Sequence, residues 1–144
     1  MYGRSKRFSQ SLHQSNDPKS RQIVKDYLAR YGLIVKDNSD KYGVDLISDD
    51  GNLQIELEHR LPWVDEEFPY AEVNVPERKA KFLKEGKVQY IILSRAYDRL
   101  GIILGEIIKP YIVDDNLVVN PNKFVRNDEY FFKVPKTAFK WVKI

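Results

Sequence analysis

Three acidic side chains stand where two neighbouring strands would bring them together. Asp45 lies in a strand-like run at 43–48, and Glu56 and Glu58 lie in a second run at 53–59. Residues two apart on a strand project to the same side, so Glu56 and Glu58 share a face. Like charges on one face repel unless water solvates them or a cation neutralises them, and carboxylate oxygens are ligands that Mg²⁺ and Mn²⁺ favour. The residue types therefore favour a divalent-metal site, and a water-exposed acidic face is the alternative.

A tight turn between the two runs sets which residues face each other. The connecting residues are Asp49-Asp50-Gly51-Asn52, and Asp-Gly is a strong hairpin signal. A turn centred there puts Leu46 opposite Ile55 and Asp45 opposite Glu56, with Cβ atoms about 5 Å apart. The other face of the hairpin is apolar, which predicts that it enters the core. Its residues are Val44, Leu46, Leu53, Ile55 and Leu57.

The charged residues are unevenly distributed along the chain. Residues 37–72 hold eleven acidic and two basic side chains, a formal charge of −9, whereas the remaining residues carry +12. An acidic block inside a basic chain indicates a place that gathers cations, surrounded by a surface that attracts a polyanion. An ordinary solvated acidic surface would give the same totals, so charge alone leaves both interpretations open.

The elements that must position the hairpin are predicted from capping and periodicity. A helix is expected from Pro18, with Asp17 as its N-cap, to a stop at Gly32, and a second helix from 76 to about 85. Other strands are predicted at 33–35, 88–94, 117–120 and 130–134, with a terminal turn at 135–141. Residues 99–108 fit either a strand or a helix, and their glycines favour a strand. Residues 60–74 are expected to form a long loop, with a strand at its end as an alternative. We expect one mixed α/β (α+β) domain over residues 17–144. Its central mixed sheet would carry the antiparallel hairpin between flanking helices, after a flexible basic arm at 1–16.

Composition excludes several classes of protein. The 144 residues, of 17.0 kDa, include no cysteine, which excludes disulfides, thiolate metal sites and cysteine nucleophiles. No apolar run approaches the ~20 residues of a membrane helix, and no apolar segment follows the basic start as in a secretory leader. Phosphate-binding and dinucleotide-binding glycine motifs are absent, so no organic cofactor is expected. The sequence predicts an intracellular, cytoplasmic protein with no membrane partner.

The order helix, strand, acid-bearing hairpin, helix, strand resembles that of the PD-(D/E)XK nuclease superfamily, the restriction endonuclease-like proteins. The matching residues are Val44-Asp45 and Glu56-Leu57-Glu58, within a resemblance that covers residues 17–94. The resemblance implies that Asp45, Glu56 and the backbone carbonyl of Leu57 bind Mg²⁺ or Mn²⁺. It further implies hydrolysis of DNA phosphodiester bonds by a metal-dependent endonuclease that acts as a homodimer.

The chain departs from the family pattern in its last motif residue. Glu58 stands where lysine is usual; in some restriction endonucleases a glutamate there ligates metal or activates water, and it can otherwise mean lost catalysis. Lys79 is the candidate replacement, because it lies on the apolar side of the second helix and family members with a lysine on this helix are known. Snorkelling of Lys79 to solvent is the alternative.

A basic surface would hold the DNA backbone. The candidate contacts are Arg4, Lys6, Arg7, Lys41, Arg78, Lys81 and Lys84. Two rival functions stay open: a catalytically silent nucleic-acid-binding module, and a protein-interaction domain whose acidic loop at 65–67 docks a basic partner. The small cysteine-free chain also suggests a phage or mobile-element origin. His59 alternates with Ile55 and Leu57 and is predicted to pack rather than to act as a base.

Overall fold

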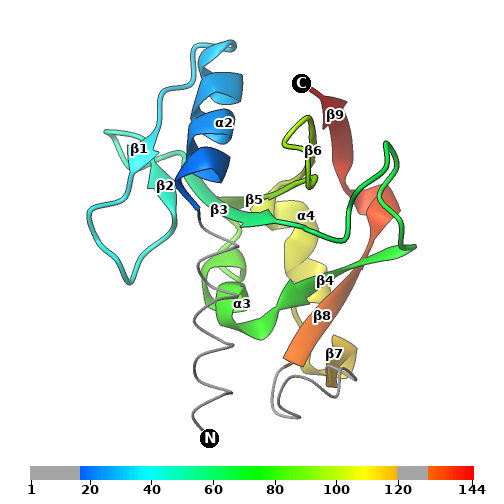
Figure 1. Ribbon diagram of the computed structural model, residues 1–144. Helices are drawn as coiled ribbons and strands as arrows, with labels where there is room; N and C mark the ends of the chain where they lie inside the picture. The colour runs from blue at the N-terminus through cyan, green and yellow to red at the C-terminus, as the bar shows by residue number, and fades with distance from the viewer. Residues whose placement is uncertain (1–16, 120–129) are drawn as a thin grey trace, which may run out of the picture.

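Two β-sheets and three α-helices make up the described part of the chain, residues 17–119 and 130–144 of a computed structural model (Figure 1). The larger sheet has the order β1-β2-β3-β5-β6-β9 and the smaller has the order β4-β8-β7. The β3–β5 pair is parallel, and the other pairs of the larger sheet are antiparallel. The mixed α+β class and the mixed sheet of a single domain are thus confirmed. The basic arm with Arg4, Lys6 and Arg7 lies outside the described residues.

The strands and helices have the following bounds. The larger sheet contains β1 (Lys36–Asp37), β2 (Leu46–Ile47), β3 (Gln54–His59), β5 (Val88–Leu93), β6 (Arg99–Ile103) and β9 (Lys140–Lys143). The smaller sheet contains β4 (Glu72–Pro76), β7 (Leu117–Val119) and β8 (Tyr130–Pro135). The helices are α2 (Pro18–Ala29), α3 (Glu77–Leu83) and α4 (Gly105–Ile108), with 3-10 turns η1 (Lys109–Tyr111), η2 (Asp114–Asn116) and η3 (Lys136–Ala138). In the described ranges no helix has the length and apolar character needed to cross a membrane.

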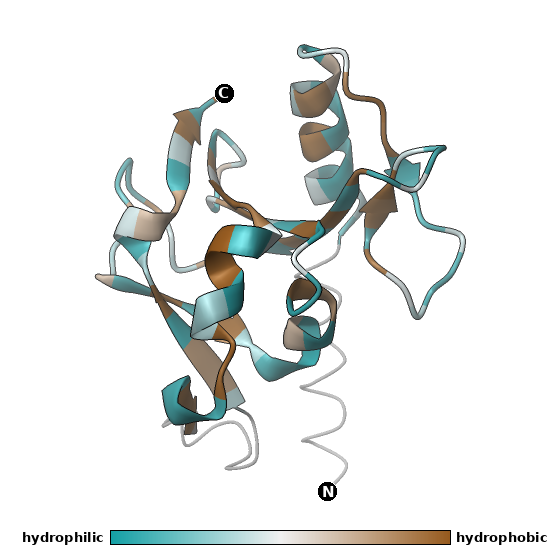
Figure 2. Ribbon diagram, turned by 180° about the vertical axis from the view of Figure 1, so that it is seen from behind, coloured by the Kyte–Doolittle hydropathy of each residue, from teal (hydrophilic) through white to brown (hydrophobic). Residues whose placement is uncertain are grey.

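Both faces of the larger sheet are covered, by different elements. Helix α2 packs on one face, where its apolar side meets β2, β3, β5 and β6. Helices α3 and α4 and the smaller sheet cover the other face. In Figure 2, α2 contains both hydrophobic and hydrophilic residues, as expected of an amphipathic helix. Strand β3 is consequently buried on both sides, from Ile55 through His59.

The hairpin has the predicted register. Leu46 pairs with Ile55 and Ile47 with Gln54, and Gly51 takes a φ of 75° in the turn. The ladder between the strands is short, because β2 covers only the first two residues of β3. Val44 is buried as expected but on the other face: it packs on the α3 side, whereas Leu46 packs beneath α2, because β2 begins only at Leu46 and the strand alternation does not extend to residue 44.

Several predicted boundaries are wrong. The first short strand is at Lys36–Asp37 rather than 33–35. The predicted strand at 99–108 ends at Ile103, and α4 follows, because Gly105 lets the helix start approach the backbone of β5: a Cβ on it would lie 2.5 Å from the carbonyl oxygen of Val88. The predicted terminal turn contains the 3-10 turn η3 and then the edge strand β9, which pairs with β6. The long loop at 60–74 ends in β4, which agrees with the alternative of a strand at the end of this loop.

Candidate functional site

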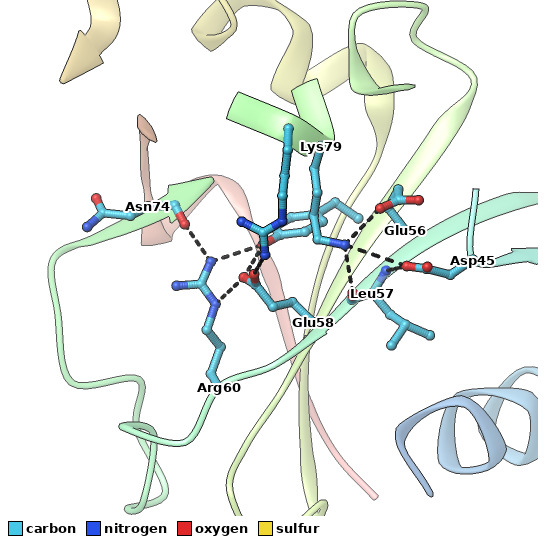
Figure 3. A network of polar contacts seen from close by, with 9 residues as sticks. Asp45, Glu56, Leu57, Glu58, Arg60, Asn74 and Lys79 are labelled. Carbon is cyan, nitrogen blue, oxygen red and sulfur yellow. Dashed lines mark hydrogen bonds and ion pairs between the residues drawn. The ribbon is translucent and has the colours of Figure 1, made fainter. Parts of the chain in front are cut away.

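The site lies where β3 extends beyond its pairing with β2. Strand β2 pairs only with Gln54 and Ile55, so the backbone of Leu57 is bonded by side chains instead. The Leu57 N–H donates to Asp45 Oδ2 at 2.9 Å, and Lys79 Nζ donates to the Leu57 carbonyl at 3.2 Å (Figure 3). A peptide group buried without partners is costly, so these contacts hold Asp45 and Lys79 at one place.

Asp45, Glu56, Lys79 and the Leu57 carbonyl form what we call the acidic cluster. Lys79 Nζ lies 2.8 Å from Glu56 Oε2 and 3.6 Å from Asp45 Oδ2. Glu56 is 2% exposed and Lys79 is 6% exposed, so the ammonium points inward and does not snorkel. The alternative of a water-exposed acidic face is therefore wrong for Glu56.

Burial and charge have opposite effects within the acidic cluster. Burial raises the pKa of Glu56 to about 7, against the attraction of Lys79 and with added repulsion from Asp45. Burial by itself would lower the pKa of Lys79, but the carboxylates of Glu56, Asp45 and Glu58 together outweigh it and raise that pKa. The cluster thus holds two carboxyl groups and one cation, with more acid than a single ammonium neutralises.

Glu58, Arg60, Arg78 and Tyr90 form a second group, the guanidinium cluster. Glu58 Oε1 lies 2.6 Å from Arg60 Nε and accepts a 2.8 Å hydrogen bond from the Tyr90 hydroxyl, while Arg78 lies 3.6 Å from Glu58 Oε2. Arg60 also donates to the carbonyl of Asn74 (Figure 3) and to the hydroxyl oxygen of Tyr90. Burial would raise the pKa of Glu58, but the cations of Arg60, Lys79 and Arg78 lower it. Glu58 is therefore a buried, ionised carboxylate enclosed by cations.

The three acids consequently do not converge as the hairpin alone predicts. Asp45 and Glu56 meet at Lys79, and Glu58 is held by the guanidinium cluster. Across residues 17–119 and 130–144, no three side chains of the aspartate, glutamate and histidine types gather closely enough to hold a metal ion. The oxygens that do surround one cation, the Lys79 ammonium, are Glu56 Oε2, Asp45 Oδ2 and the Leu57 carbonyl, and they are of the hard type that Mg²⁺ and Mn²⁺ favour.

Helix α3 brings the basic residues of both clusters to β3. It follows β4 directly, and its buried side carries Lys79, Ala80 and Leu83. Arg78, a predicted contact for the DNA backbone, is half-buried and lies 3.6 Å from Glu58 Oε2. Lys81 and Lys84 are exposed as expected.

The remaining predicted residues lie apart from the clusters. Lys41 is exposed, beside the ring of Tyr42. His59 is packed as predicted, stacked on Tyr97 with its Nε2 3.1 Å from the Arg95 carbonyl oxygen. In the acidic loop, the carboxylates of Glu66 and Glu67 form exposed ion pairs with Arg99 and Lys136.

Sequence reasoning missed Arg60 and Tyr90. Arg60 follows Glu58 by two residues, so the same alternation that grouped Glu56 with Glu58 could have placed Arg60 beside it. Tyr90 gave no such signal, because its place depends on the parallel pairing of β3 with β5, in which it lies opposite Glu56.

Comparisons of the chain with protein-family models, with curated proteins and with solved structures find no match.

Proposed function

We propose that the protein is a metal-dependent endonuclease that hydrolyses phosphodiester bonds in DNA. The observation that carries the proposal is the convergence of Asp45, Glu56 and the Leu57 carbonyl on one buried cation position. The three oxygens are of the donor types that hard divalent cations use, and the two carboxylates carry more negative charge than the single Lys79 ammonium neutralises.

The topology around the site supports the same proposal. Chain order runs from α2 through β1, β2 and β3 to β4 and α3 and then into β5, which lies parallel to β3. Apart from the inserted β4, this is the order expected of a restriction endonuclease-like core. The acid-bearing positions fall at the start of β2 and in the middle of β3, next to the crossover helix.

Each residue of the acidic cluster has a part in the proposed reaction. Asp45, Glu56 and the Leu57 carbonyl would hold Mg²⁺ or Mn²⁺, which supplies a Lewis acid and lowers the pKa of bound water. Lys79, released from Glu56, would stabilise the negative charge that develops on the phosphate oxygens. Glu58 would not act as a base, because its carboxylate already serves Arg60, Arg78 and Tyr90. It would instead hold the two guanidinium groups beside the phosphate.

Charge supports a nucleic-acid substrate, and the choice of DNA rests on the resemblance to the nuclease superfamily. Lys41, Lys81 and Lys84 are exposed, and the chain outside residues 37–72 carries +12. Such a surface binds a phosphate backbone electrostatically and with strong salt dependence. Action as a homodimer, with one site for each strand, belongs to the same proposal.

Nicking of supercoiled plasmid with Mg²⁺ tests the proposal. The wild type should nick DNA, chelation of the metal should stop it, and Asp45→Ala and Glu56→Ala should each lose about 10²–10³-fold in rate. Asp49→Asn is the matched control, since it alters an exposed acid of the same hairpin that pairs only with Lys36 on the surface. Equal rates in all four proteins, or cleavage of RNA alone, would contradict the assignment.

One observation favours the silent nucleic-acid-binding module as a second candidate. Lys79, Arg60 and Arg78 already give every buried acid a cationic partner. In that case DNA binding would persist and fall with salt, the protein would bind no Mn²⁺, and no variant of the acidic cluster would alter DNA binding.

A further inference from the structure

We infer that Lys79 is an internal competitor for the divalent cation: its ammonium occupies the position that the cation would take, and it must withdraw before the cation binds. The inference rests on the proposed metal site and adds a regulation to it. The site would be closed by its own lysine at rest and opened by metal.

The geometry makes lysine and metal mutually exclusive. Lys79 Nζ contacts Glu56 Oε2 at 2.8 Å and the Leu57 carbonyl at 3.2 Å, with Asp45 Oδ2 at 3.6 Å. Mg²⁺ would need the same oxygens at about 2.0–2.1 Å. The two cations would therefore compete for the same three oxygens, at a place where Lys79 is 6% exposed and Glu56 is 2% exposed.

The displaced ammonium has another carboxylate within reach. Glu58 lies two residues from Glu56 on β3 and projects to the same face, although it belongs to the guanidinium cluster. A long, unbranched side chain can swing between neighbouring acids without movement of helix α3, because lysine has four rotatable bonds. If Lys79 paired with Glu58 instead of Glu56, its ammonium would stay inside the site and could contact the bound phosphate.

The competition has a definite sign. A binding-competent form populated in only a tenth of the molecules weakens apparent metal affinity about tenfold. Removal of Lys79 should therefore tighten metal binding while it weakens hydrolysis. A lysine that helped to build the metal site would give the reverse effect on metal binding.

Calorimetric titration with Mn²⁺ in the absence of DNA tests the inference. Lys79→Gln keeps an amide donor for Glu56 and should bind Mn²⁺ at least about tenfold more tightly than the wild type. Arg78→Gln removes the adjacent positive charge of α3 without vacating the three oxygens, and should gain less than about threefold. Lys87→Gln, at an exposed position, controls for net charge and should match the wild type.

The outcomes separate the inference from the proposed function. Equal affinity in the wild type and Lys79→Gln, or an equal gain in Arg78→Gln, overturns the competition while the metal site survives. Absence of Mn²⁺ binding at millimolar concentration in all of these proteins overturns the metal site and the competition with it. Binding by Lys79→Gln alone supports the competition and overturns metal-dependent hydrolysis by the wild type.

A measurement on the wild type keeps the test independent of variant folding. The side-chain ¹³Cε chemical shift of Lys79 should change on saturation with Mg²⁺, because the ammonium leaves Glu56 and the Leu57 carbonyl. The signals of the exposed Lys81 and Lys84 serve as internal references that should not move. An unchanged Lys79 signal at saturating metal would overturn the inference.

Discussion

Glu56 and Glu58 lie two residues apart on the same strand, and both are buried, yet their surroundings have opposite effects. The pKa of Glu56 is raised to about 7, chiefly by burial, whereas that of Glu58 is lowered because its cations outweigh burial. Glu56 shares one ammonium with Asp45, while Glu58 has two guanidinium groups and a phenol. The number of cations for each carboxylate, rather than depth in the fold, decides the difference.

The two clusters therefore have opposite formal charge. The acidic cluster has two carboxylates and one ammonium, and the guanidinium cluster has one carboxylate and two guanidinium groups. A surplus of acid suits a metal cation, and a surplus of arginine suits a phosphate. Under the proposed function, the acidic cluster would bind the metal ion and the guanidinium cluster would bind the phosphate, both beside β3.

The largest effect is expected from removal of a cation in the guanidinium cluster. Arg60→Met should lower the free energy of unfolding by about 3–5 kcal/mol, because it leaves Glu58 buried with an incomplete set of partners. Urea denaturation at pH 7 measures the loss. Lys136→Met, which breaks the exposed pair with Glu67, is the control and should cost under about 1 kcal/mol. Similar losses in both variants would show that the guanidinium cluster is not a stabilising unit.

Substitution of the cation in the acidic cluster should chiefly affect activity. Lys79→Met should slow DNA nicking about 10²–10³-fold, the loss typical of a group that stabilises developing charge. The nicking assay with Mg²⁺ measures this, and Lys87→Met serves as the exposed control. An active Lys79→Met protein would remove the lysine from the reaction and leave it a structural residue.

The pH dependence of stability should distinguish the two glutamates. The folded-state pKa of Glu56 lies above its ordinary 4.5, so between pH 4.5 and about 7 the folded state holds a proton that the unfolded state has lost. Stability relative to Glu56→Gln should therefore fall by up to about 3 kcal/mol as the pH rises through that window. Parallel profiles for the two proteins would contradict the raised pKa.

Glu58 should behave in the opposite sense. Its folded-state pKa is lowered, so its contribution is present above pH 4.5 and is lost as the pH falls through the lowered pKa. Comparison of the wild type with Glu58→Gln in urea at acid pH measures this loss. A stability difference that shrinks on acidification is the expected result, and one that grows would contradict it.

The smallest effect is expected outside the clusters. Lys81→Gln and Lys84→Gln should each weaken DNA binding uniformly across sequences and lower the salt slope by about 1. Fluorescence anisotropy at several salt concentrations measures this. An unchanged slope in both variants would place the DNA-binding face away from the exposed side of α3.

The hairpin was predictable because its information is local. The Asp50-Gly51 turn sets the register of Leu46 with Ile55, and that register brings Asp45 beside Glu56. The inward position of Lys79 was also open to prediction, since its helical spacing to Leu83 sets the buried side of α3.

The remainder depends on long-range packing that no local pattern contains. Burial of Glu58 requires the smaller sheet and α3 to cover β3, and Tyr90 reaches it only through a parallel crossover. The local pattern at 135–141 predicts a turn and gives no sign of strand β9, because that strand depends on its pairing with β6. At this pairing Gly101 leaves space for the Trp141 ring, since a Cβ on Gly101 would lie 2.5 Å from a ring carbon. Gly101 lies within β6 and Gly105 begins α4, and each allows a neighbouring group to approach closely.

The backbone of Leu57 bonds to the side chains of Asp45 and Lys79, so its chemical shifts report the state of the acidic cluster. Its amide proton senses Asp45 and its carbonyl senses Lys79. A single isotope-labelled leucine would therefore register, by its nitrogen and carbonyl chemical shifts, which ion sits beside it, in a spectrum recorded without substrate or turnover.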